Sequence, residues 1–145
     1  MEDMFILTKG KEIDNELLKF IINNDEVCLD TIDGTGTYFF INKKSDYNQI
    51  LLDFYKDEKM KKMEYDFNFP PEEDELIKKY LDFKDLKEIN LIGVSYRGKE
   101  FIYNLLKDFF KEMYQEGKLK NTKVVVSEDN NYAVINGELV KLEEG

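Results

Sequence analysis

Segment 93–99 carries residue types that suit phosphate binding. Its sequence, Gly-Val-Ser-Tyr-Arg-Gly-Lys, matches the first seven positions of the phosphate-binding loop G-x-x-x-x-G-K. A predicted strand precedes the segment and a predicted helix follows it, so backbone N–H groups at the helix N-terminus can face an anion beside Lys99. Arg97, Gly98 and Lys99 are therefore a candidate anion- or phosphate-binding site.

Two features of the same segment favour a purely structural role. The eighth position is Glu100, where the loop needs a Ser or Thr hydroxyl to ligate Mg²⁺. Residues 94–96 are Val, Ser and Tyr, which favour continuation of the strand to Tyr96. We interpret the segment as a strand end and a tight turn before a helix, and keep nucleotide or phosphate binding as the alternative.

Two aspartates form a second candidate site. Asp30 and Asp33 lie beside a Gly-Thr turn, where carboxylates suit Mg²⁺ and nearby hydroxyl and amide groups suit phosphate. The same residues are typical of a β-hairpin turn, because Asp-Gly tolerates positive φ. We therefore predict a hairpin here, keep the metal site as an alternative, and expect no cofactor.

Segment 64–75 combines aromatic and acidic side chains around two prolines. The candidate partner-binding residues are Glu64, Tyr65, Asp66, Phe67, Phe69, Glu72, Glu73, Asp74 and Glu75. Acids of this density steer a basic protein, and aromatic side chains supply contact area. The alternative is ordinary helix-start chemistry after Pro70-Pro71, with Phe67 and Phe69 as core residues of an edge strand.

The chain contains no histidine and a single cysteine. Without histidine it lacks the side chain that titrates nearest neutral pH and commonly serves as a general base. Cys28 lies in a predicted strand, where Asp25, Glu26 and Asp30 surround it in sequence and disfavour the thiolate. We therefore predict a buried, unreactive thiol, assign no catalytic residue, and lean against an enzyme.

The formal net charge of the chain is -10. This charge disfavours direct binding to nucleic acid and to anionic membranes, which both need clustered Lys and Arg. No apolar stretch reaches the roughly 20 residues that span a bilayer, and the first residues lack the pattern of a secretory signal. A single cysteine suits a reducing compartment, so we predict a cytoplasmic protein.

Hydrophobic periodicity predicts the elements of the fold. Helices are predicted at 14–23, from 45–46 onward, at 72–81 and at 99–116. The second of these has Tyr47, Ile50, Leu51 and Phe54 on its buried face. Strands are predicted at 4–7, 26–32, 37–41, 89–96, 122–126, 132–135 and 139–142, with a short extended segment at 64–69.

This order of elements predicts a single α+β domain over residues 1–145. We expect a mixed, mostly antiparallel sheet of about five to six strands, with three to four helices on one face. The last three strands form a C-terminal β-meander, whose final turn at Asn136-Gly137 is a strong hairpin signal.

Three functions are compatible with these patterns. The first is a small acidic binding protein that neutralises a basic protein partner, such as a toxin or nuclease domain, in the manner of immunity proteins, antitoxins or phage-encoded inhibitors. The second is a phosphate-handling enzyme that uses Asp30, Asp33 and Lys99. The third is an accessory domain that forms a homo-oligomer through a sheet edge or an aromatic patch.

Overall fold

An eight-stranded antiparallel sheet organises the chain. The computed structural model describes residues 1–33 and 36–143, without the side chains of Thr31 and Asp33. The strands follow the order β2-β3-β4-β5-β1-β6-β7-β8. The α+β class is confirmed, and the sheet has more strands than the sequence predicts.

The strands are β1 (Glu2–Lys9), β2 (Val27–Asp33), β3 (Thr37–Asn42), β4 (Gln49–Phe54), β5 (Ile89–Arg97), β6 (Lys123–Ser127), β7 (Asn131–Ile135) and β8 (Glu138–Lys141). The helices are α1 (Asp14–Ile22), α2 (Glu58–Asn68), α3 (Pro71–Leu81) and α4 (Lys99–Gln115), with a short 3₁₀ helix at Leu86–Glu88. No helix of the described residues has the length and apolar character needed to cross a membrane.

The central strands β1 and β5 are apolar on both faces. They pair along their whole length, from Glu2 opposite Tyr96 to Lys9 opposite Ile89. Because side chains alternate along a strand, Ile6 of β1 enters one core and Leu7 enters another on the opposite face. A sheet centre of this composition is stable only when both of its faces are covered.

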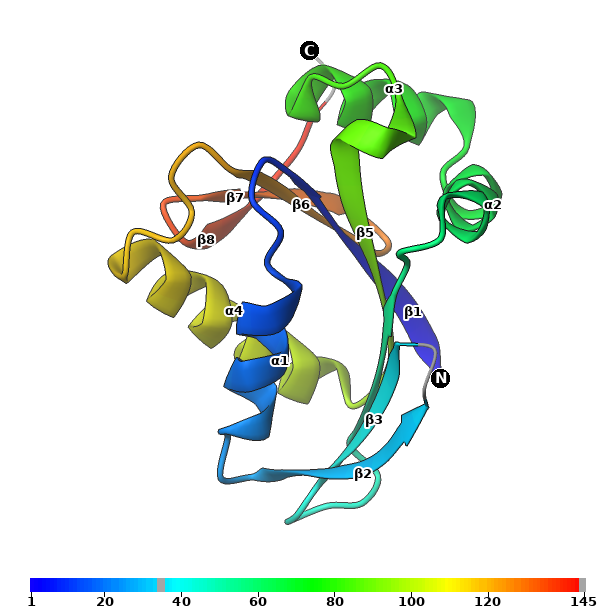
Figure 1. Ribbon diagram of the computed structural model, residues 1–145. Coiled ribbons are helices and arrows are strands. Elements are labelled where there is room, and N and C mark those ends of the chain that lie inside the picture. Colours follow the sequence, from blue (N-terminus) through cyan, green and yellow to red (C-terminus); the bar gives the residue numbers. More distant parts are fainter. Residues whose placement is uncertain (34–35, 144–145) are drawn as a thin grey trace.

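Helices supply that cover on both faces. Helices α1 and α4 lie together on one side of the sheet, and α2 and α3 lie on the other side (Figure 1). The first pair packs over Ile6 and Ile92, whereas the second pair packs over Leu7, Leu91 and Val125. The expected placement of all helices on one face is therefore wrong, because it overlooks the second apolar face of β1 and β5.

The predicted helix from residues 45–46 is also wrong. Residues Gln49–Phe54 form strand β4, which pairs with β3 and β5. Its side chains alternate: Ile50 and Leu52 enter the larger core, while Leu51 is half-buried on the opposite face. Tyr47, expected in the helix interior, is 65% exposed.

The helix of this region begins later and includes residues that were expected to be extended. Asp57 caps α2 by accepting hydrogen bonds from the backbone N–H groups of Lys59 and Met60, each at 3.0 Å. The helix continues through residues 64–68, so the extended segment predicted at 64–69 is wrong. Pro70 then provides the N-cap of α3, for which proline near the first helical position is typical.

Most of the remaining elements match their predicted positions within a few residues. Helices α1, α3 and α4, the β2–β3 hairpin and the C-terminal meander are confirmed. The turn residues 34–35 of that hairpin lie outside the described residues. Asp14 is the first residue of α1 and forms an ion pair with Lys56.

Because residues 49–54 form a strand, Ile50 and Leu51 lie on opposite faces of the sheet and should contribute differently to stability. Ile50→Ala removes a side chain with 0% exposure and should cost about 2–5 kcal/mol. Leu51→Ala removes a half-buried side chain on the other face and should cost much less. Urea denaturation of both variants measures the difference. Equal losses would contradict the strand, because both residues share one face of the alternative helix.

Candidate partner-binding surface

Segment 64–75 lies on two helices that meet at Pro70-Pro71. Residues 64–68 belong to α2, and residues 71–75 belong to α3. The helical arrangement separates its aromatic side chains: Tyr65 and Phe69 are 3% and 4% exposed, whereas Phe67 is 88% exposed. The predicted surface therefore divides into a buried part and an exposed part.

Tyr65 and Phe69 belong to the core beneath α2 and α3. Their rings stack at 4.6 Å between centroids, and Phe69 also meets Phe5 of β1 edge to face. The Tyr65 hydroxyl donates a 2.5 Å hydrogen bond to Asp74, which joins the two helices. Burial, followed by this contact with Asp74, raises the pKa of Tyr65. These aromatic rings are not available to a partner, which corrects their assignment as contact residues.

Two of the acids in this segment are already paired within the protein. Asp66 accepts from Lys62 at 2.8 Å, and Asp74 pairs with Lys78 at 3.1 Å. Glu72 and Glu75 are exposed, and Glu64 and Glu73 are half-buried. These four glutamates form no ion pair among the described residues.

Helix α2 presents an apolar stripe to solvent. The stripe consists of Met60, Met63 and Phe67, which are 48%, 65% and 88% exposed. Their spacing of three and then four residues places them on one side of the helix. Lys61 and Tyr65, on the other side, are buried against the sheet. The sequence pattern did not single out Met60 or Met63, because both lie beyond the apolar spacing of the helix predicted from residues 45–46.

A small cavity of about 190 Å³ lies beside this stripe and has acidic walls. Phe67 and Glu64 of α2 line it together with Asp3 of β1 and Asp53 of β4. The three carboxylates accept hydrogen bonds from uncharged side chains: Asn68 to Glu64, Ser95 to Asp3 and Thr37 to Asp53. Within residues 1–33 and 36–143, none of the three carboxylates forms an ion pair.

Tyr55 lies in the same cavity, against the backbone of Gly93. Burial, followed by the charges of Asp53, Glu64 and Asp3, raises the pKa of the Tyr55 hydroxyl to about 12. A Cβ atom at Gly93 would lie 2.9 Å from the tyrosine ring, so any larger residue there would displace Tyr55. Gly93 thus lets the Tyr55 ring lie against the sheet.

The geometry of residues 93–99 differs from that of a phosphate loop. Residues 93–97 continue strand β5 and pair with β1 and β4 on either side. Arg97 is exposed at the end of the strand. Lys99 forms ion pairs with Glu128 at 3.3 Å and Asp129 at 3.8 Å, so an anion at Lys99 would face two carboxylates.

The aspartates of the second candidate site are not brought into a metal centre by the described residues. Asp30 is exposed at a bulge of the edge strand β2, and the side chain of Asp33 lies outside the described part. No group of three or more potential ligands is placed to hold a metal ion among the residues that the structure describes. Cys28 is exposed, not buried as predicted, and it lies on the edge strand β2.

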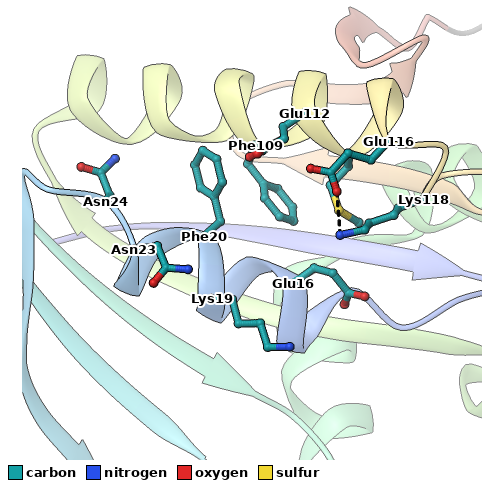
Figure 2. A pocket seen from close by; sticks show the side chains of 10 residues that line it. Glu16, Lys19, Phe20, Asn23, Asn24, Phe109, Glu112, Glu116 and Lys118 are labelled. Atoms are coloured by element: carbon teal, nitrogen blue, oxygen red, sulfur yellow. Dashed lines mark ion pairs between the residues drawn. The ribbon is translucent and has the colours of Figure 1, made fainter.

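A second surface groove, of about 470 Å³, runs between α1 and α4. Figure 2 shows Phe20 and Phe109 between the two helices, where their rings meet edge to face at 5.4 Å. Glu116 at its rim pairs with Lys118 at 2.7 Å. Glu16 also has a lysine partner, Lys11 at 3.3 Å, so two of the three glutamates of the groove are paired, unlike the carboxylates of the cavity beside α2.

Comparison of the chain with protein families, with curated proteins and with solved structures finds no match. The candidate site is therefore argued from the chemistry of this chain alone.

The role of Gly98, the glycine that precedes Lys99, can be tested by substitution. Its φ of +86° favours glycine, and a Cβ atom there would lie 2.1 Å from Oδ1 of Asn48. Gly117 has a similar φ of +71° but its nearest atom, on Lys120, would be at an ordinary 3.5 Å. Either alanine substitution should cost about 1–2 kcal/mol for the left-handed backbone.

Gly98→Ala should therefore destabilise the protein more than Gly117→Ala in urea denaturation. Adding Asn48→Ala should recover the excess, since it removes the close contact. If the two alanine variants instead lose equal stability, with no recovery when Asn48→Ala is added, then the contact with Asn48 does not explain the need for glycine at position 98.

The burial of Glu128 predicts that the stability of the protein depends on pH. Its side chain is 8% exposed, and burial, then the charges of Asp129 and Glu2, raises its pKa from the ordinary value of 4.5. Folding thus disfavours the ionised form even though Lys99 lies 3.3 Å away, because that lysine is 57% exposed and its attraction is screened by water. The stability associated with this carboxyl is lost as pH rises through the folded-state pKa. Glu128→Gln cannot ionise, and it keeps an acceptor for the Tyr103 hydroxyl, 2.9 Å away.

We expect Glu128→Gln to be more stable than the wild type at neutral pH and equally stable well below pH 4.5. Urea denaturation at several pH values measures this difference, with Glu138→Gln on the exposed strand β8 as control. A difference that is independent of pH would contradict the assignment.

Proposed function

We propose that this chain is an acidic binding protein that captures and neutralises a basic protein partner. The observation that carries the proposal is the stripe Met60, Met63 and Phe67 beside the carboxylates of Asp3 and Asp53. Exposed apolar side chains are the usual anchors of a protein interface. Carboxylates without a cationic partner favour an incoming Lys or Arg over any other charged group.

The two parts of this surface contribute in different ways. The net charge of -10 accelerates encounter with a basic protein, and this effect weakens as salt is added. Phe67 stabilises the complex because its exposed ring becomes buried at the interface. Full burial of a phenylalanine side chain is worth about 1.5–3 kcal/mol. Glu72 and Glu75 of α3 are also exposed, in a separate groove that they line together with Lys79 and Lys123.

The other two functions have less support. A phosphate-handling enzyme needs an available cation at Lys99, whose ammonium group pairs with Glu128 and Asp129. Self-association through β2 is favoured by the exposed side chains of Leu29 and Ile32, which are 37% and 57% exposed. The bulge next to Leu29 opposes it, because bulges protect sheet edges from pairing.

The test begins with the immobilised protein and an extract of the cell in which it is made. A retained protein is identified, purified and measured against the wild type by titration calorimetry at low and moderate salt. We expect a partner of basic isoelectric point whose affinity falls with salt. Phe67→Ala should weaken binding by about tenfold or more, as expected for an interface anchor.

Charge reversal at Glu64 and Asp53 should weaken binding further, mainly through slower association. The matched control reverses Glu138, an exposed glutamate on β8 at the far end of the sheet. The proposal fails if no basic protein is retained, or if a retained protein binds Phe67→Ala and the reversed variant as tightly as the wild type.

A further inference from the structure

The face of the sheet that carries α2 and α3 is only half covered. These helices pack over β5, β1 and β6, where Leu91, Leu7 and Val125 form the smaller core. On the same side, the described residues place no helix over β2 and β3, which Figure 1 shows below α2. The opposite face of β2 is occupied, because α1 contacts this strand.

The uncovered half presents a continuous apolar patch. Strand register places Leu51 directly between Phe39 of β3 and Ser95 of β5, and places Ile41 beside Cys28 of β2. Directly opposed residues on antiparallel strands share one face. Phe39, Ile41 and Leu51 are half-buried, and neither hydrophobic core includes them.

The dimensions of this patch suit one helix. Neighbouring strands are about 4.8 Å apart, so β2, β3 and β4 span about 10 Å from the first to the third. An α-helix with its side chains is about 10–12 Å wide. The patch is bounded on one side by α2, whose stripe of Met60, Met63 and Phe67 would border a helix lying beside it.

Charge identifies the kind of helix. Asp53 lies on the same face as Leu51, at the next outward position of β4. Asp3 lies across β5 from Leu51, opposite Ser95, and lines the same cavity as Asp53. With Glu64 of α2 they make this end of the patch acidic. Arg97 lies at the other end, opposite Gln49. A second copy of this chain would add another charge of -10, so complementarity favours a positively charged occupant.

We propose that the patch formed by Phe39, Ile41 and Leu51 is the docking site for an amphipathic helix of the partner protein, with Lys or Arg residues at the end that lies over Asp3 and Asp53. The helix places its apolar side on the sheet, as a helix of the protein's own fold would. This inference rests on the proposed function and adds to it the surface and the secondary structure of the ligand.

The test uses a defined probe, so it does not depend on identifying the partner. The probe is a Leu–Lys peptide of about 18 residues, or roughly five helical turns, with its leucines on one side. One control peptide has the same composition with the leucine spacing disrupted, and another replaces every Lys by Glu. Backbone amide shifts of the full chain are followed by NMR during titration with each peptide.

We expect saturable shifts at Phe39, Ile41 and Leu51 with the Leu–Lys peptide, and weak or no binding of both controls. Leu51→Lys should weaken binding by about tenfold or more, since it removes an apolar contact and repels lysine. The matched control, Val140→Lys, alters a 44% exposed side chain on β8 and should bind as the wild type does.

Three results would overturn the inference: no saturable binding, shifts centred on the groove between α1 and α4, or equal binding of the disrupted peptide. Shift mapping on the wild type keeps the test valid even if Leu51→Lys does not fold. The proposed function is judged separately by the captured partner. A basic partner that loses affinity for Phe67→Ala but binds Leu51→Lys as tightly as the wild type would contradict the helix docking site and still support the proposed function.

Discussion

The pairing of β1 with β5 is the constraint on which the rest of the structure depends. Both strands carry apolar side chains on alternate faces, so the sheet must be covered on two sides where they lie. Helices α1 and α4 cover one side, and α2 and α3 cover part of the other. Covering the second side with α2 is what brings its exposed stripe next to the acidic strand ends of Asp3 and Asp53.

Sequence periodicity predicts the elements whose pattern has only one interpretation. Helix α4 is long and keeps one apolar side throughout, and the β2–β3 and β7–β8 hairpins have glycine in their turn sequences. Strand β4 was missed because Ile50, Leu51 and Phe54 satisfy helical spacing, whereas Ile50, Leu52 and Phe54 satisfy strand alternation. Pairing with β3 and β5 decides between helix and strand, because it places Ile50 in the larger core and Leu51 on the opposite face.

The candidate surface could be predicted only in part. Local composition identified Glu64 and Phe67, because aromatic and acidic residues cluster there in sequence. It did not identify Asp3 or Asp53, which reach the same cavity through the register of β1, β5 and β4. Nor did it separate Phe67 from Tyr65 and Phe69, since the direction of a side chain on α2 depends on where the helix meets the sheet. Long-range pairing of this kind leaves no trace in a short segment of sequence.

The position of α2 and α3 in the chain has an evolutionary consequence. They lie between β4 and β5, which are hydrogen-bonded neighbours, so residues 55–88 leave the sheet and return to the adjacent strand. Such an excursion can change in length and sequence without altering the order of the strands. Selection for new specificity can therefore act on this segment, provided that each replacement still covers Leu7, Leu91 and Val125. Related chains would then share the sheet and differ most in residues 55–88, which carry the stripe of Met60, Met63 and Phe67.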